Sequence, residues 1–337
     1  MFNFDPDRFL RIESGAADTA RQLGTLVRDL VADGADSLFY MGAGGAGILM
    51  QPAADLLARE SALPCFNVLC AEVVVTGHKA LGKGSIVVMP SLSGTTKESI
   101  AALDFAQAQG ARVITIVGHA ETPLAEKADH CFVNFAQDDT SCEMFYMASL
   151  AAAFGAMQAR GERDDFDEMA EQLAAFPGEL LKIKEQFEPR AKALAEEIQS
   201  DTYHIITGAG PVWPEAYYYG MCILEEMQWI RTRPVHASDF FHGTLELVEN
   251  GVSVLVFMGE DETRPLADRV VSFAREHTDR LIVLDTREME TTGLSPAFRA
   301  LMAPAMLATM LERLSAHLEH LRDHPLETRR YYRRVAY

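Results

Sequence analysis

The fold is decided by Ser37-Leu-Phe-Tyr-Met-Gly-Ala-Gly-Gly-Ala-Gly47 and its counterpart Tyr203-His-Ile-Ile-Thr-Gly-Ala-Gly210. In each stretch a short apolar run, typical of a buried strand, leads directly into a Gly-Ala-Gly turn. The two turns begin at residues 42 and 208, so they are 166 residues apart, close to half of the 337-residue chain. This spacing predicts an internal duplication of one α/β unit.

The residues around these turns repeat one pattern of short apolar runs and amphipathic stretches. In the first half we expect strands over 65–75, 85–90, 112–117 and 131–135, with helices ending near 59 and covering 97–109. In the second half we expect strands over 252–258 and 280–285, with helices ending near 230 and covering 263–277. Short strands that alternate with helices predict an α/β fold of two doubly wound parallel sheets in tandem.

The remaining segments complete the predicted domain organisation. The expected parts are an N-terminal helical segment (1–34), a first domain (35–162), a helical connection (163–200), a second domain (201–323) and a C-terminal tail (324–337). Phe176-Pro-Gly178 is expected to interrupt the helical connection. The tail ends in the basic, aromatic run 328–337. It is either a frayed terminus or a segment that folds back over an anionic site, because three tyrosines are costly to expose.

Composition excludes several classes of function. The chain has 49 Asp+Glu against 30 Lys+Arg, a formal charge of −19, which argues against a nucleic-acid partner. The first residues are acidic where a signal peptide needs a basic start, and the uncharged stretches 37–54 and 144–159 are too short or too interrupted to span a membrane. We therefore expect a cytoplasmic protein with no membrane partner.

Metal and dinucleotide cofactors are not expected. The five cysteines lack C-x-x-C spacing and read as reduced thiols, and His317 and His320, three apart in a helical stretch, have no further ligand at suitable spacing. Gly42-x-Gly44-x-x-Gly47 satisfies the dinucleotide pattern, but the acid required about 20 residues later is missing near 62–65, and Glu72 comes too late.

A stronger signal is Pro90-Ser-Leu-Ser-Gly-Thr-Thr-Lys-Glu-Ser99, which follows one predicted strand and precedes a helix. Ser91, Ser93, Thr95 and Thr96 place four hydroxyl groups and free backbone N–H groups at the positive end of that helix. One such residue would be an ordinary helix cap, whereas four in six positions predict a binding loop for a single phosphate monoester.

A second group of residues has the chemistry of proton transfer. Glu225 and Glu226 lie among Leu224, Met227 and other apolar residues near a predicted helix end, where reduced hydration makes a carboxylate a better base. An exposed acidic turn is the alternative. His242 precedes a glycine, so a loop could direct its imidazole into a cleft, where its pKa suits proton transfer near neutrality.

Together these motifs resemble the SIS (sugar isomerase) family. The resemblance rests on the glycine turn at 42–45, Ala71-Glu72, the Ser-x-Ser-Gly-x-Thr run from Ser91, and a glutamate followed sixteen residues later by His242-Gly243. The chain is similar to the isomerase part of glucosamine-6-phosphate synthase. It is more similar to the deglycases of 6-phosphorylated fructoselysine and glucoselysine, whose likeness extends to 226–230, 239–243 and the ending 324–332.

The resemblance implies a homodimer with active sites shared between subunits. It implies that Ser91, Ser93 and Thr96 bind phosphate, that Glu226 is the catalytic base, and that His242 serves the sugar ring oxygen from the neighbouring subunit. Glu72 matches an acid near the site. Ala46 replaces a serine frequent in relatives, so the backbone N–H groups of Gly44 and Gly45 are expected to contribute more.

The resemblance also implies a reaction that needs no cofactor. A base removes a proton from the carbon beside the carbonyl or imine, and reprotonation on the other carbon moves the C=N bond. The resulting imine hydrolyses to a hexose phosphate and a free amino acid. Ile223, where the synthase has a lysine, argues against amino transfer. The alternatives are an aldose–ketose phosphosugar isomerase and a non-catalytic phosphosugar-binding regulator. Fewer than 40 residues precede the first strand, which leaves no room for the DNA-binding helix-turn-helix of such regulators.

Overall fold

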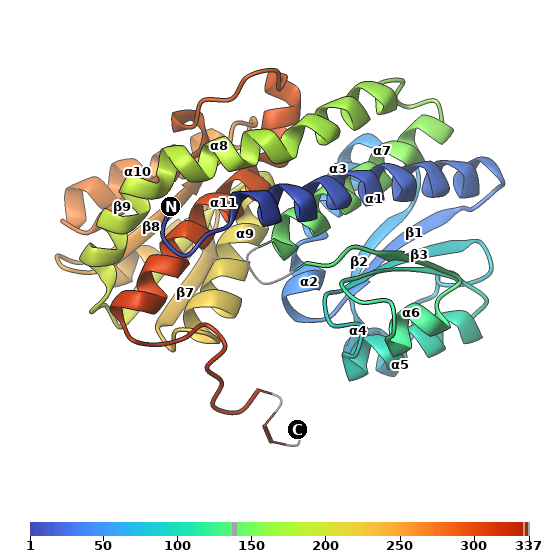
Figure 1. The fold of residues 1–337 in the computed structure, drawn as a ribbon, viewed down its shortest axis with the longest axis horizontal. Coiled ribbons are helices and arrows are strands. Elements are labelled where there is room, and N and C mark those ends of the chain that lie inside the picture. The colour runs from blue at the N-terminus through green and yellow to red at the C-terminus, as the bar shows by residue number, and fades with distance from the viewer. Residues whose placement is uncertain (137–139, 333, 336–337) are drawn as a thin grey trace. The chain divides into compact units, whose positions relative to one another are not determined.

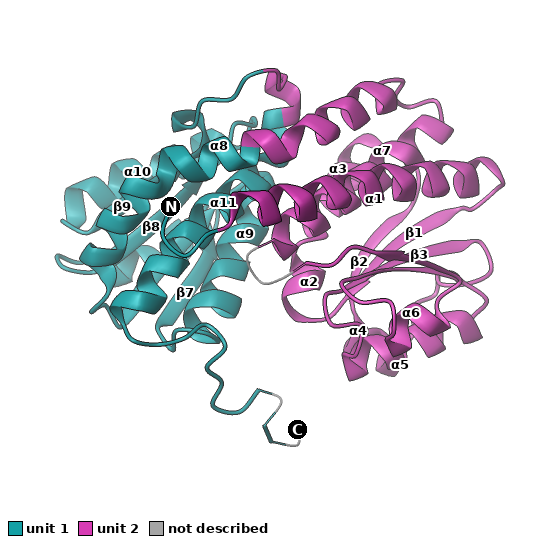
Figure 2. Cartoon of the chain, in the orientation of Figure 1, with its two compact units in different colours: residues 1–4, 180–292, 299–337 teal, residues 5–179, 293–298 magenta. Residues whose placement is uncertain are grey.

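The chain folds into two compact units, each with its own sheet and core (Figure 2). The N-terminal unit consists of residues 5–179 and 293–298, and the C-terminal unit consists of residues 1–4, 180–292 and 299–337. The computed structural model describes residues 1–136, 140–332 and 334–335. Two long helices, α8 (Phe166–Ile198) and α11 (Pro296–Leu321), are labelled in Figure 1. Both contribute residues to the two units.

The N-terminal unit is built on a five-stranded parallel sheet in the order β2-β1-β3-β4-β5. Its strands are β1 (Ser37–Gly42), β2 (Cys65–Leu69), β3 (Ser85–Ser91), β4 (Arg112–Val117) and β5 (His130–Val133). Its other helices are α1 (Pro6–Ala32), α2 (Gly44–Ile48), α3 (Gln51–Glu60), α4 (Cys70–Thr76), α5 (Lys97–Ala108), α6 (Pro123–Lys127) and α7 (Ser141–Ala159). Every residue of β1 and β3 is buried, as expected of central strands covered by helices on both faces.

The contact between α1 and α7 forms much of the core of this unit. α1 begins where Asp5 accepts a hydrogen bond from the backbone N–H of Arg8 (3.0 Å), and Pro6 occupies its first position. α7 is buried from Ser141 to Met157. The two helices approach so closely that a Cβ on Gly155 would lie 2.1 Å from the carbonyl oxygen of Gly24, so glycine is required at the crossing.

The C-terminal unit is built on a four-stranded parallel sheet in the order β7-β6-β8-β9. Its strands are β6 (Tyr203–Gly208), β7 (Arg231–His236), β8 (Ser253–Met258) and β9 (Leu281–Asp285). Between them lie α9 (Trp213–Tyr218), a π-helix (Tyr219–Glu225), α10 (Arg264–His277) and 3₁₀ turns at 210–212, 240–242, 244–247 and 286–288. The predicted fold class, two doubly wound parallel α/β sheets in tandem, is confirmed.

Three local predictions are wrong. The strand expected over 65–75 ends at Leu69, which pairs with Gly42 at the end of β1, so β2 has no partner beyond it and the chain turns into α4. α8 continues through Pro177-Gly178 because buried residues such as Phe176 and Leu180 keep the helix packed on both sides of the proline. β7 was not expected because its sequence is polar. Among the described strands it pairs with β6 alone, and an edge strand of this kind tolerates polar residues.

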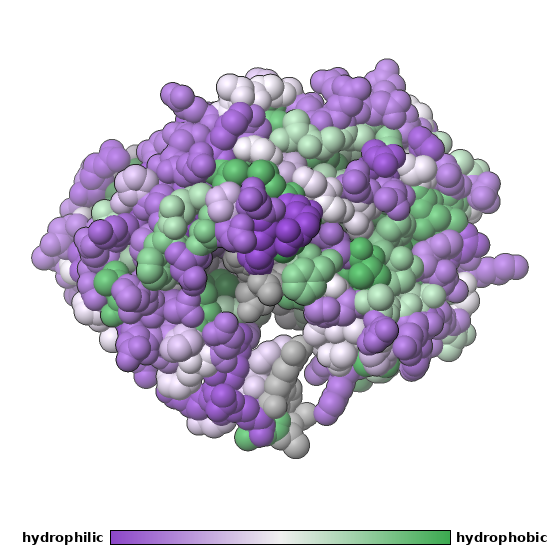
Figure 3. All heavy atoms as spheres, in the orientation of Figure 1, coloured by the Kyte–Doolittle hydropathy of each residue, from purple (hydrophilic) through white to green (hydrophobic). Residues whose placement is uncertain are grey.

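No helix in the described parts of the chain is long and apolar enough to cross a membrane. On the face drawn in Figure 3, hydrophilic residues predominate and hydrophobic ones form small separate areas.

The buried His204 predicts how stability depends on pH. Burial, helped by the nearby Arg280 and Arg322, lowers the pKa of His204 to about 4, and its Nδ1 is 2.8 Å from the Oγ of Ser253 on β8. Between about pH 6.5 and pH 4, His204 is therefore protonated in the unfolded chain but neutral in the folded chain. Its effect on the free energy of unfolding is absent above this range, and the free energy of unfolding falls as the pH decreases through it.

We expect wild type to lose about 2 kcal/mol more unfolding free energy than His204→Asn when the pH is lowered from 7 to 5. Asparagine can keep a hydrogen bond to Ser253 and has no titrating ring. Urea unfolding at both pH values measures the difference. An identical pH dependence in the two proteins would show that His204 accepts its proton in the folded state.

Candidate functional site

The predicted phosphate loop lies where the N-terminal sheet changes direction. β1 and β3 are neighbours, but the chain leaves β1 toward β2 on one side and leaves β3 toward β4 on the other. The segments that follow β1 and β3 therefore separate at the carboxyl edge of the sheet, which is the position where open α/β sheets bind ligands. These segments are the glycine turn at 43–47 and the hydroxyl-rich loop at 92–96.

The hydroxyl-rich loop presents its donors at the start of α5. Ser91 is the last residue of β3 and is buried, and the Oγ of Ser93 accepts hydrogen bonds from the backbone N–H of Thr95 (3.3 Å) and from its hydroxyl group (3.1 Å). Thr96 occupies the N-cap position of α5, and no side chain caps this helix. The backbone N–H groups of the first turn have no acceptor within the helix, and the hydroxyl residues directly precede them in the sequence. This combination suits a phosphate monoester.

Gly94 sets the course of this loop. Its φ is +63°, and a Cβ at this position would lie 2.2 Å from the Oγ1 of Thr122, the N-cap residue of α6. The backbone N–H of Gly94 donates to the carbonyl oxygen of Ser91 (3.1 Å) and its carbonyl oxygen accepts from the N–H of Leu124 (3.2 Å). Only glycine meets both the backbone conformation and the close contact with Thr122.

Gly94→Ala is expected to lower the free energy of unfolding by about 2 to 4 kcal/mol, the sum of the left-handed backbone cost and the steric conflict with Thr122. Gly82→Ala is the matched control, because Gly82 has no positive φ and a Cβ there meets no atom within 4 Å. Urea unfolding of both variants provides the comparison, and equal stabilities would contradict the close contact.

Close packing explains why the turn at 42–47 contains glycine. A Cβ on Gly42 would lie 2.3 Å from the Cα of Gly47, so both positions require glycine whether or not a ligand binds. Gly44 has φ +57° and open space around it, and Gly44 and Gly45 begin α2, which no side chain caps. Glu72 is exposed in the first turn of α4, after β2, at the same carboxyl edge of the sheet.

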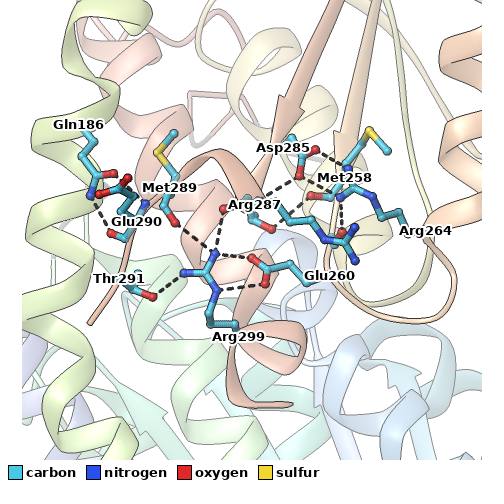
Figure 4. Close-up of polar contacts among 12 residues, drawn as sticks. Gln186, Met258, Glu260, Arg264, Asp285, Arg287, Met289, Glu290, Thr291 and Arg299 are labelled. Carbon is cyan, nitrogen blue, oxygen red and sulfur yellow. Dashed lines mark hydrogen bonds and ion pairs between the residues drawn. The ribbon is translucent and has the colours of Figure 1, made fainter. Parts of the chain in front are cut away.

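The equivalent position in the C-terminal unit is filled by the protein's own side chains. Gly210, after β6, has φ +58°, and a Cβ there would lie 2.3 Å from the Oγ1 of Thr263 and 2.6 Å from the Oδ2 of Asp261 in the segment after β8. Glu260 in the same segment forms a two-pronged ion pair with Arg299 (2.6 and 3.0 Å; Figure 4). The segment after β8 thus carries acidic side chains, where the N-terminal unit has hydroxyl groups. Because carboxylates repel a phosphate group, this edge of the C-terminal sheet does not suit one.

Glu225 and Glu226 lie at the end of a π-helix, a segment of irregular backbone. Residues 219–225 form a π-helix, an arrangement frequent at functional sites, and Trp229 has φ +56°, which is rare outside glycine. Glu225 accepts hydrogen bonds from the backbone N–H (3.1 Å) and the hydroxyl group (2.7 Å) of Thr232, so it holds the start of β7. Glu226 is part-exposed and pairs with Arg329 (Nε to Oε1, 2.9 Å).

The cysteines are free thiols, and Cys70, Cys142 and Cys222 are buried. Cys222 lies one turn before Glu226, and burial, reinforced by Glu226, Glu215 and Glu225, raises its pKa to about 12. Such a thiol stays protonated and is a poor nucleophile. Within residues 1–136, 140–332 and 334–335, no cluster of three or more His, Cys, Asp or Glu side chains could hold a metal ion.

His242 ends the 3₁₀ turn that begins at Phe240 and is followed by Gly243, whose φ is +152°. The imidazole is exposed, and in the described part of the chain it has no hydrogen-bond or ion-pair partner. An imidazole presented in this way is available to a molecule outside its own chain.

Sequence reasoning missed the direct contact between the tail and Glu226. Arg329 belongs to the basic run at 328–334, whose composition indicated that it could fold back over an anionic site. That composition was the available signal, but it did not single out Arg329 or identify Glu226 as its partner.

Comparison with known proteins identifies the family of the first domain. Residues 34–159, which contain β1 to β5, the glycine turn and the hydroxyl-rich loop, match the family model named SIS domain. This part of the chain is a SIS domain. The second parallel sheet, in the C-terminal unit, is consistent with a tandem arrangement of two SIS domains.

The relatives of this chain include enzymes. Fructosamine deglycase FrlB of Bacillus subtilis is 29% identical over 97% of the chain and 100% of its own length, and fructoselysine 6-phosphate deglycase of Escherichia coli is 26% identical over 91% and 88%. A solved structure described as a phosphosugar isomerase of Bacillus subtilis has a TM-score of 0.85 at 28% identity, covering 95% of this chain and 100% of that one. A Salmonella typhimurium structure described in the same way has a TM-score of 0.86 at 26% identity and covers 96% and 99%.

Proposed function

We propose that the chain is a deglycase that cleaves a 6-phosphorylated sugar–amino acid conjugate, of the fructoselysine or glucoselysine 6-phosphate type, to a hexose 6-phosphate and a free amino acid. The observation that carries the proposal is the different environment of Glu225 and Glu226. Glu225 accepts hydrogen bonds from Thr232 at the start of β7, whereas Glu226 is part-exposed and pairs with a residue of the C-terminal tail. The names of the full-length relatives support the same substrate class.

In this proposal the SIS domain holds the phosphate group. Ser91, Ser93, Thr95 and Thr96 supply hydroxyl groups, and α5 supplies backbone N–H groups at its positive end. Gly44 and Gly45 supply further N–H groups from the neighbouring turn, and Glu72 lies at the same edge near the sugar. Binding energy from this remote end aligns the reacting carbon with the base.

Glu226 carries out the proton transfers. For a conjugate with nitrogen on C1 and a carbonyl group at C2, the carboxylate removes a proton from C1, the C–H electron pair forms the C1=C2 bond, and the carbonyl oxygen takes up a proton from water to give an enaminol. Protonation of C2 by the same carboxylic acid moves the double bond to C1=N, and the nitrogen gives up its proton to water. Water then adds to this imine, the C–N bond breaks, and the amino acid leaves with the proton that the nitrogen takes up.

His242 is proposed to open the sugar ring by passing a proton at the ring oxygen. Its exposed imidazole, with no partner in the described chain, fits a role in the active site of a neighbouring subunit. The proposal thus includes a homodimer with shared active sites, located in the cytoplasm, where reduced thiols and hexose phosphates occur.

Mixing two inactive variants tests the shared site. Glu226→Gln and His242→Ala subunits, each inactive alone, are expected to regain about a quarter of wild-type activity per total subunit when unfolded together and refolded as mixed dimers. Half of the dimers are then mixed, and each has one intact site. Refolding each variant alone is the control. No recovery from verified mixed dimers would place both residues in one subunit's site.

The function itself is tested by incubating the protein with fructoselysine 6-phosphate and with glucoselysine 6-phosphate. Release of lysine from at least one conjugate is expected. Interconversion of fructose 6-phosphate and glucose 6-phosphate without any lysine release would favour the isomerase named for the solved relatives instead.

A further inference from the structure

The C-terminal tail is anchored beside the candidate base. The side chain of Gln228 donates to the carbonyl oxygen of His324 (2.8 Å), and the rings of Trp229 and His324 meet edge to face with centroids 4.6 Å apart. Farther along, the guanidinium of Arg330 lies 4.0 Å from the centre of the Trp229 ring. These contacts attach the tail at two points to the residues that directly follow Glu226.

Arg329 lies between these two attachments, and the tail itself holds it. Its Nη1 donates to the carbonyl oxygens of Leu326 and Thr328 (3.1 Å for Thr328), while its Nε faces the Oε1 of Glu226 at 2.9 Å. The side chain of Arg329 is 15% exposed and that of Glu226 is 31% exposed. The guanidinium is therefore positioned by its own segment and would stay in place if Glu226 turned away.

The ion pair has a chemical consequence for a base. A carboxylate that pairs with a guanidinium loses much of its ability to accept a proton from carbon. For Glu226 to act, Arg329 needs another anion of the same shape. An amino acid joined through nitrogen to the sugar brings such a group, because its carboxylate offers the two oxygens that a guanidinium binds.

We propose that Arg329 binds the carboxylate of the amino-acid part of the substrate and in doing so releases Glu226. The inference rests on the proposed deglycase function and names the group that reads the amino acid. A plain hexose phosphate has no carboxylate to exchange, so it leaves the ion pair closed. Arg329 thereby selects conjugates over the free sugar phosphates that share the same phosphate loop.

The test compares conjugates that differ only in the carboxylate. One pair is the 6-phosphorylated fructose conjugates of glycine and methylamine, and the other is those of lysine, joined through its side-chain nitrogen, and 1,5-diaminopentane. kcat and KM for amine release are measured with wild type, Arg329→Gln, Arg329→Lys and Arg334→Gln. Arg334→Gln is the matched control, because it removes the same charge from an exposed position of the same tail.

Wild type is expected to favour the carboxylate-bearing member of at least one pair by tenfold or more in kcat/KM. Arg329→Gln is expected to bring that ratio close to one, Arg329→Lys to keep part of it, and Arg334→Gln to keep all of it. A preference in the glycine pair would show that Arg329 binds a carboxylate close to the linking nitrogen. A preference in the lysine pair would show that it binds a carboxylate at the far end of the side chain.

Equal kcat/KM values within both pairs for wild type would overturn the role of Arg329 and leave the deglycase function standing. A preference that survives in Arg329→Gln would assign the recognition to another residue. If wild type released no amine from any conjugate, the deglycase function would fail, and the inference with it.

Discussion

Glu226→Gln is expected to lower kcat for amino-acid release at least 10³-fold, because positioned acid–base catalysis contributes about 10²–10⁴-fold and glutamine cannot carry the proton. Glutamine has the same size as glutamate, and its amide oxygen can still face Arg329. The free energy of unfolding is therefore expected to change by less than about 1 kcal/mol. Amino-acid release and urea unfolding of the same preparation measure the two effects.

Glu225→Gln is the matched control for this variant. The glutamine oxygen can still accept the two hydrogen bonds from Thr232, so kcat is expected to stay within about threefold of wild type. Loss of activity in Glu225→Gln with activity kept in Glu226→Gln would exchange the roles of the two acids.

Removal of the phosphate group from the substrate is expected to lower kcat/KM about 10³-fold or more. Hydrogen bonds to a charged group contribute about 1.5–3 kcal/mol each, and several loop donors would lose their partner together. The measurement compares fructoselysine with its 6-phosphate. In the double variant Ser93→Ala, Thr96→Val, removal of the phosphate is expected to lower kcat/KM by a smaller factor, because fewer hydrogen-bond donors bind the phosphate in this variant.

Thr263→Val supplies the comparison in the C-terminal unit. Thr263 lies at the equivalent sheet edge, where acids fill the position, so this variant is expected to show the same dependence on phosphate as wild type. Efficient cleavage of unphosphorylated fructoselysine by wild type would contradict the assignment of the loop at 91–96.

The central strands could be predicted, and the loop at 91–96 could be singled out as a candidate phosphate site, because their signals are local. β1, β3, β4 and β8 are continuous apolar runs between helices, and burial on both faces explains that composition. The four hydroxyl residues from Ser91 to Thr96 exceed what a helix cap needs. The structure adds that they lie at the reversal of strand order, which depends on pairing between distant segments.

Features that depend on tertiary contacts could not be predicted in this way. β7 is polar because one of its edges has no partner strand, and α4 begins because β1 ends opposite Leu69. The ion pair between Glu226 and Arg329 joins residues about a hundred positions apart. The composition of the tail left a frayed terminus and a segment folded over an anionic site as alternatives, and only the fold selects Glu226 among the 49 acidic residues of the chain.

The proposed proton transfer by Glu226 is tested most directly by following the hydrogen on the carbon that bears nitrogen. Fructoselysine 6-phosphate carrying two deuterium atoms at C1 is incubated with the protein, and lysine and the hexose phosphate are analysed by mass spectrometry and NMR. The account predicts lysine release and glucose 6-phosphate with one deuterium left at C1, because the base has removed the other. Lysine release with both deuterium atoms still at C1 would contradict proton transfer by Glu226, and no lysine release from this conjugate or from glucoselysine 6-phosphate would contradict the deglycase itself.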